Sequence, residues 1–185
     1  MPQSLHSAPT HRGSAVVVIR LTQSQLDDAT ALARATHAKW GARRGYYPNK
    51  FETHLKGKMG EVAVETWAVG LGRKVDSAFR DMSREREADL VIDGKRVEVK
   101  TWDVTGWQEW GRCVRPPQVP QLRAKADAVV WCYLEDAAVT IVGWSTLKDI
   151  EQVEVTVTGP TYNRLENHQV PLDEVRDLGD LLTTL

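Results

Sequence analysis

The chain has 185 residues, of which 42% are hydrophobic and 26% are charged, and its formal net charge is −1 at pH 7. These values are typical of a globular domain that buries its core without disulfides or structural zinc. The two cysteines, Cys113 and Cys132, have no framework or metal-ligand spacing, and no apolar run approaches the roughly 18 residues that cross a bilayer. We therefore expect a reduced, cytoplasmic protein with no membrane partner.

The first half of the chain predicts a leader, a strand and two helices. Residues 1–14 lack the apolar stretch of a secretory signal and are expected to be flexible, and residues 15–185 are expected to form a single domain. Residues 15–21 are β-branched and apolar, as in a strand. Thr22 and Gln25 have the spacing of a capping box, which opens a helix that ends near residue 41. A second helix is expected over residues 58–69.

The second half predicts mainly strands. Their expected ranges are 74–79, 88–92, 96–101, 126–134, 139–144 and 153–158. Ser145 is expected to cap a short helix that ends near residue 151, and a final helix is expected over residues 173–182. Helices followed by strands and short helices indicate an α+β or α/β protein, and we predict the α/β class with a central mixed β-sheet flanked by helices.

A basic segment with interleaved aromatic residues precedes the second helix. Between residues 39 and 58 there are six Lys or Arg residues against one acid, together with Tyr46, Tyr47 and Phe51. This pattern suits a phosphate backbone with bases stacked nearby, and the alternative is an ordinary solvated loop. Its position before the second helix favours nucleic-acid binding, which we assign to Arg43, Arg44, Lys50, Lys56 and Lys58.

The strongest candidate for chemistry is a β-hairpin. Asp93-Gly94 is typical of a two-residue turn, which would place Asp89 directly opposite Glu98. A turn at Gly94-Lys95 is the alternative, and it would place Asp89 opposite Lys100. Side chains alternate along a strand, so Asp89, Glu98 and Lys100 share one face in both registers.

Two opposed carboxylates among leucine and β-branched neighbours are costly unless positive charge lies between them. Lys100 offsets one charge, and a divalent cation would offset the rest. Oxygen ligands favour Mg²⁺ or Mn²⁺. The alternative is a surface hairpin whose charges are solvated.

The second helix adds a carboxylate to this picture. Its apolar residues surround most of its circumference, so the helix is expected to be buried, and Glu61 in its first turn needs a partner. A metal ion would be one such partner. The alternative is that Glu61 only interacts favourably with the helix N-terminus.

These elements together resemble the PD-(D/E)XK nuclease superfamily, whose pattern is a helical glutamate, a strand aspartate and a Glu-x-Lys after a turn. Here the pattern reads Gly60-Glu61, Ala88-Asp89-Leu90 and Glu98-Val99-Lys100, with alanine where the family name has proline. The segment from Gln121 through Trp144 resembles the helix and strands that complete the core. The likeness covers residues 57–145, about half of the chain.

The resemblance implies a restriction-endonuclease-like core and a Mg²⁺-dependent endonuclease that hydrolyses DNA. Asp89, Glu98, the Val99 carbonyl and Glu61 would bind the metal, and Lys100 would orient the attacking water and stabilise the developing charge. Gln121 joins the expected nucleic-acid-binding residues, and cleavage of a duplex would favour a homodimer. The alternatives are a catalytically silent module that binds DNA or protein, or a structural partner in a phage, repair or defence complex.

Three tryptophans follow the proposed catalytic lysine closely in what the sequence predicts to be an irregular stretch. Trp102, Trp107 and Trp110 would either stack on bases beside the site or pack beneath the loop as a second small core. The sequence does not choose between these two interpretations.

Overall fold

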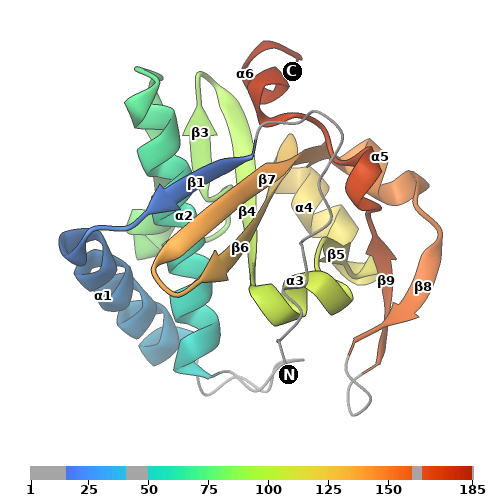
Figure 1. Cartoon of the computed structure of the whole chain (residues 1–185), viewed down its shortest axis with the longest axis horizontal. Helices are drawn as coiled ribbons and strands as arrows, with labels where there is room; N and C mark the ends of the chain where they lie inside the picture. The colour runs from blue at the N-terminus through green and yellow to red at the C-terminus, as the bar shows by residue number, and fades with distance from the viewer. Residues whose placement is uncertain (1–15, 41–49, 160–163, 185) are drawn as a thin grey trace, which may run out of the picture.

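The computed structural model describes residues 16–40, 50–159 and 164–184, and the expected leader lies outside them. The protein is α/β, with a mixed, curled six-stranded sheet flanked by helices, which confirms the predicted class (Figure 1). The sheet has the strand order β1-β7-β6-β4-β3-β2, and a second sheet has the order β5-β9-β8. β4 pairs with β6 in parallel, and every other neighbouring pair in the two sheets is antiparallel.

The strands of the large sheet have the bounds β1 Val17–Arg20, β2 Val75–Asp76, β3 Leu90–Ile92, β4 Lys95–Asp103, β6 Ala128–Glu135 and β7 Ala138–Thr146. The small sheet contains β5 Cys113–Val114, β8 Val155–Thr158 and β9 Leu165–Gln169. The helices are α1 Gln23–Trp40, α2 Phe51–Gly70, α3 Val104–Trp110, α4 Val119–Lys125, α5 Leu147–Gln152 and α6 Leu181–Thr184. Five short 3₁₀ helices accompany them, η1 Ala78–Arg80, η2 Met82–Arg84, η3 Pro116–Gln118, η4 Leu172–Glu174 and η5 Leu178–Asp180.

Two hydrophobic cores cover the two faces of the large sheet. The first joins α1 and α2 to the sheet through residues such as Val62, Trp67 and Val130. The second joins α3, α4, α5 and β5 to the opposite face around Trp131. Successive side chains of β6 point to opposite faces of the sheet, so Val130 and Trp131 belong to different cores.

The predicted start of α1 is confirmed by its hydrogen bonds, and the cap of α5 was assigned to the wrong residue. Thr22 and Gln25 form the expected capping box at α1, with the Gln25 N–H donating to Thr22 Oγ1 at 3.3 Å. At α5 the cap is Thr146 and not Ser145, and the Asp149 N–H donates to Thr146 Oγ1 at 3.0 Å. Ser145 is instead buried, where its hydroxyl accepts the indole N–H of Trp131 at 2.8 Å.

Other expected elements differ from the structure in extent. The strand predicted over 74–79 is limited to β2, and the helix predicted over 173–182 is replaced by η4, η5 and α6. In the latter segment the backbone leaves a helical path because Arg176 forms an isolated bridge with Trp144 of β7. The prediction also missed β9, whose residues Leu165–Gln169 lack regular alternation of apolar and polar side chains.

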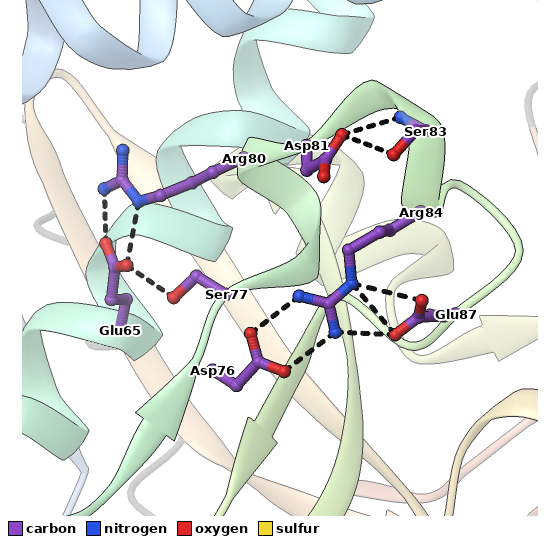
Figure 2. Close-up of polar contacts among 8 residues, drawn as sticks. All are labelled: Glu65, Asp76, Ser77, Arg80, Asp81, Ser83, Arg84 and Glu87. Carbon is purple, nitrogen blue, oxygen red and sulfur yellow. Dashed lines mark hydrogen bonds and ion pairs between the residues drawn. The ribbon is translucent and has the colours of Figure 1, made fainter.

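The segment between β2 and β3 is held by a network of charged side chains (Figure 2). Arg80 binds Glu65 of α2, and Ser77 donates a hydrogen bond to the same carboxylate. Arg84 binds Asp76 through both terminal nitrogens, at 2.7 and 2.8 Å, and also binds Glu87. These contacts position the chain immediately before Asp89.

The final segment of the chain closes the fold against β7. Arg176 exchanges two backbone hydrogen bonds with Trp144, at 3.1 and 2.9 Å, and Leu178 and Leu181 enter the first core. Gly143 permits this approach, because a Cβ there would lie 2.2 Å from the Arg176 carbonyl oxygen. In the part of the chain that the structure describes, no helix has the length and apolar character needed to span a membrane.

Candidate active site

The predicted hairpin forms in the first of its two possible registers. Asp93 and Gly94, with φ angles of 50° and 87°, make the two-residue turn, and Ile92 pairs with Lys95. A type I′ turn, which matches the twist of the two strands that it joins, requires positive φ at both central residues. Leu90 pairs with Val97, so the next pair outward is Asp89 opposite Glu98.

Asp89 immediately precedes β3 and is anchored by the neighbouring strand β4. Its Oδ2 atom accepts a hydrogen bond from the Val99 N–H at 2.8 Å. The N–H and C=O of one strand residue point toward the same side. The Val99 carbonyl therefore also faces the side of β4 on which Asp89 lies.

Glu98 lies in contact with two lysines. Lys100 Nζ is 3.0 Å from Glu98 Oε1, and Lys125 Nζ is 2.5 Å from Glu98 Oε2, while the glutamate side chain is only 7% exposed. The Lys125 contact is an ion pair without the alignment of a hydrogen bond, so the buried Oε2 atom has no hydrogen-bond donor in the described chain. Burial would raise the pKa of Glu98, but the charges of Lys100 and Lys125 lower it more, and the carboxylate stays ionised.

The Lys125 contact was not predicted. Sequence reasoning chose Gln121 on the same helix, and that residue is exposed. Lys125 is the last residue of α4, the helix that connects β4 to its parallel neighbour β6. A helix that connects two parallel neighbouring strands ends close to both of them. The last turn of α4 was therefore the place where a residue in contact with Glu98 of β4 could have been predicted.

Glu61 on α2 completes the group of carboxylates. It is 8% exposed, and its Oε2 atom lies 2.6 Å from Lys58 Nζ, one turn earlier on the helix. Burial and the charge of Asp89 raise the pKa of Glu61 to about 8, although Lys58 opposes this change. Burial and the charge of Glu98 likewise raise the pKa of Asp89 to about 6.

Glu61 reaches this position because α2 crosses β4 at a glycine. A Cβ on Gly60 would lie 1.9 Å from Thr101 Oγ1, so any side chain there would require the Thr101 side chain or the helix to move. This explains why glycine and glutamate are adjacent here. Gly60 permits the close approach of α2 to β4, and Glu61 is then directed toward the carboxylates of the hairpin.

The described part of the site holds as many basic as acidic side chains. Three carboxylates (Glu61, Asp89 and Glu98) face three ammonium groups (Lys58, Lys100 and Lys125). Burial lowers the pKa of Lys100, but Glu98 and Asp89 raise it more, so this lysine is charged. Each acid has a cationic neighbour, which explains how such a polar cluster is tolerated.

The donor chemistry of this cluster suits Mg²⁺ or Mn²⁺, because all its candidate ligands are oxygens. Burial, followed by the charge of a neighbouring carboxylate, raises the pKa values of Glu61 and Asp89, and the nearby lysines offset this only in part. Within residues 16–40, 50–159 and 164–184, however, no three His, Cys, Asp or Glu side chains are arranged to hold a metal ion. A cation would therefore have to displace ammonium groups from Glu61 and Glu98.

The expected nucleic-acid-binding residues are only partly free. Lys58 binds Glu61, and Lys56 Nζ lies 2.6 Å from Asp103 Oδ2. Lys50 is exposed at the start of α2, whereas Arg43 and Arg44 lie outside the described residues.

Part of the basic segment is helical, contrary to the prediction. α2 begins at Phe51 and not at Lys58, because packing outweighs the low helix propensity of Gly57. Leu55 contacts the first core, and the ring of His54 lies 5.5 Å from that of His37 on α1.

A small cavity opens beside the carboxylates. Its volume is about 170 Å³, and Asp89 and Lys58 contribute to its wall together with Phe79 and Met82. Two cations lie near the ring of Phe79, with Lys58 Nζ at 5.4 Å and the Arg80 guanidinium at 4.9 Å from its centre. Phe79 is buried, so its ring is not available for stacking on a base.

The tryptophans after Lys100 pack mainly into the protein. Trp102 lies on β4, while Trp107 and Trp110 lie on α3, where the sequence predicted an irregular stretch. The ring of Trp102 lies 6.2 Å from that of Trp107 and 6.0 Å from that of Trp131. Trp102 and Trp107 thus belong to the second core, as one of the two interpretations predicted.

No family model matches the chain, and no curated protein or solved structure matches it significantly. The likeness to PD-(D/E)XK nucleases therefore rests on the motif residues alone.

Proposed function

We propose that the protein is a Mg²⁺-dependent nuclease of the PD-(D/E)XK type that hydrolyses phosphodiester bonds of DNA. The observation that carries this proposal is the convergence of Asp89, Glu98 and Lys100 on one end of the hairpin, with Glu61 brought to them by α2. These residue types at these positions are what metal-assisted hydrolysis requires. A restriction-endonuclease-like core and a homodimer on duplex DNA belong to the same proposal.

In this proposal Asp89, Glu98, the Val99 carbonyl and Glu61 hold the metal. When bound, the cation would polarise the scissile phosphate and lower the pKa of a water molecule. Lys100 remains charged beside Glu98, so it can orient the water and stabilise negative charge that develops on the phosphate. Lys50 and the other basic residues before Glu61 would contact the phosphate backbone on either side.

The decisive experiment is cleavage of supercoiled plasmid and of labelled single-stranded and double-stranded oligonucleotides in Mg²⁺, Mn²⁺ or EDTA. We expect cutting in both metals and none in EDTA. Lys100→Ala should lower the rate by at least about a hundredfold, because it removes a group that acts in the transition state. Lys148→Ala is the matched control, because Lys148 is exposed on α5. Equal rates for Lys100→Ala and wild type would remove the basis of the proposal.

A catalytically silent DNA-binding or protein-binding module is the second candidate, and one observation favours it. The carboxylates are already paired with lysines, and the described residues contain no ready-made group of three metal ligands. Calorimetric titration with Mg²⁺ and Mn²⁺ separates the two candidates. Absence of metal binding together with absence of cutting would favour the silent module.

A further inference from the structure

Among the residues that the structure describes, the contact between Glu98 and Lys125 is the one ion pair of the site that joins distant segments of the chain. Lys100 follows Glu98 by two residues, and Lys58 precedes Glu61 by one helical turn, so these pairs are local. Lys125 approaches from α4 and contacts Oε2, the oxygen that Lys100 does not contact. Glu98, with one negative charge, thus lies between two positive charges.

This surplus of positive charge acts against a metal ion at Glu98. A divalent cation that approaches Oε2 meets the Lys125 ammonium at 2.5 Å from that oxygen. The two cations would then lie against the same oxygen, and like charges this close to each other repel strongly in a partly buried site. Full engagement of Glu98 by a metal therefore requires Lys125 to move.

Lys125 is placed to move toward a negatively charged partner. It is the last residue of α4 and its side chain is 23% exposed, while the Glu98 side chain is 7% exposed. Its flexible stem ends in a compact charge with no fixed bonding plane, unlike an arginine. A backbone phosphate of a nucleic acid is a suitable alternative partner for such a group.

We propose that Lys125 exchanges between Glu98 and a nucleic-acid phosphate, so that it restrains metal binding until substrate draws it away. The inference rests on the proposed function, because it assumes that Glu98 binds a metal and that the substrate carries phosphates. Metal and nucleic acid then favour each other's binding, because each removes the same competitor, and such coupling is reciprocal.

The exchange predicts that one substitution changes two affinities in opposite directions. Lys125→Met removes the competing charge, so the nucleic-acid-free protein should bind Mn²⁺ at least about fivefold more tightly. The same change removes a phosphate contact, so oligonucleotide binding in EDTA should weaken and its logarithmic salt slope should fall by about one. A residue with only a structural role would not tighten metal binding.

The test uses calorimetric titration with Mn²⁺ and fluorescence anisotropy of a labelled oligonucleotide in EDTA. Lys125→Gln provides a second uncharged variant of similar size, with the same two shifts expected if Lys125→Met does not fold. Lys125→Arg keeps the charge and should stay near wild type in its Mn²⁺ affinity. Lys148→Met on α5 is the control for loss of an exposed lysine.

The outcomes separate this inference from the function on which it rests. If no variant binds Mn²⁺, the proposed nuclease itself is contradicted. If wild type binds Mn²⁺ and cuts DNA, but the uncharged variants bind Mn²⁺ no more tightly, the nuclease stands and the exchange does not. Metal binding that tightens while oligonucleotide binding stays unchanged would also overturn the exchange, because Lys125 would then have no second partner.

Discussion

Asp149 shows how a partly buried carboxylate outside the candidate site is held in the ionised form. Its two oxygens accept bonds from Arg176 Nε and Nη2 at 2.7 and 2.8 Å. Burial raises the pKa of Asp149, but the bonds from Arg176 and Thr146 lower it more, and the result is a pKa below its ordinary value. The pair connects α5 to the final segment of the chain.

The lowered pKa of Asp149 predicts a stability that depends on pH. Stability from this pair is fully present above the unfolded pKa of about 3.9, and it is lost as pH falls through the lower folded value. Asp149→Asn should reduce the free energy of unfolding at pH 7 by about 1–2 kcal/mol, after allowance for solvent screening. Urea unfolding at pH 7 and pH 3.5 measures both proteins. The difference should shrink at the lower pH, and a constant difference would refute the assignment.

Among the elements, α2 depends most on a single residue for its position. Gly60 lets the helix approach β4, and the helix carries both a large part of the first core and Glu61. The element that stabilises the fold is therefore also the element that brings a carboxylate to the candidate site.

Gly60→Ala should disturb the packing of α2 on β4, because either the Thr101 side chain or the helix must move. The added Cβ would lie 1.9 Å from Thr101 Oγ1, so we expect the free energy of unfolding to fall by about 1–3 kcal/mol. Gly70→Ala at the end of the same helix is the control, because a Cβ there meets nothing within 4 Å. Urea unfolding of both variants tests this. Equal effects of the two substitutions would show that the crossing is not tight.

Features that depend on neighbouring residues could be predicted from the sequence, and features that depend on contacts between distant segments could not. The hairpin was predicted correctly in one of its two registers, because Asp93-Gly94 and the alternating strands are local signals. Lys125 was missed, because its place depends on how a crossover helix returns to the sheet. The start of α2 was also wrong, because contacts with α1 outweigh the local effect of Gly57.

At the scale of the whole molecule, the end of the chain belongs to the main core. Leu178 and Leu181 are buried against residues of α2 and the large sheet, and Lys95 donates a hydrogen bond to the Leu181 carbonyl at 3.0 Å. The last residues thus complete a face that the earlier elements leave open.

Leu181→Ala should destabilise the entire protein and not only its end. Leu181 is fully buried, so the cavity should lower the free energy of unfolding by about 2–5 kcal/mol. Leu71→Ala should change it by less than about 0.5 kcal/mol, because Leu71 is 55% exposed. Thermal and urea unfolding, followed by tryptophan fluorescence, compares the two. A small effect of Leu181→Ala would mean that the end of the chain is an appendage.

The parallel pairing of β4 with β6 has a consequence for the order in which the protein assembles. The turn that sets Asp89 beside Glu98 is local, and hairpins of this kind form in about 1–10 μs. Lys125 reaches Glu98 only after the chain has traversed α3, β5 and α4 and returned to the sheet, and such non-local contacts form slowly. We therefore expect the two acids to meet during folding before the lysine of α4 arrives. In this interval acidic conditions, which remove their repulsion, should speed the first pairing.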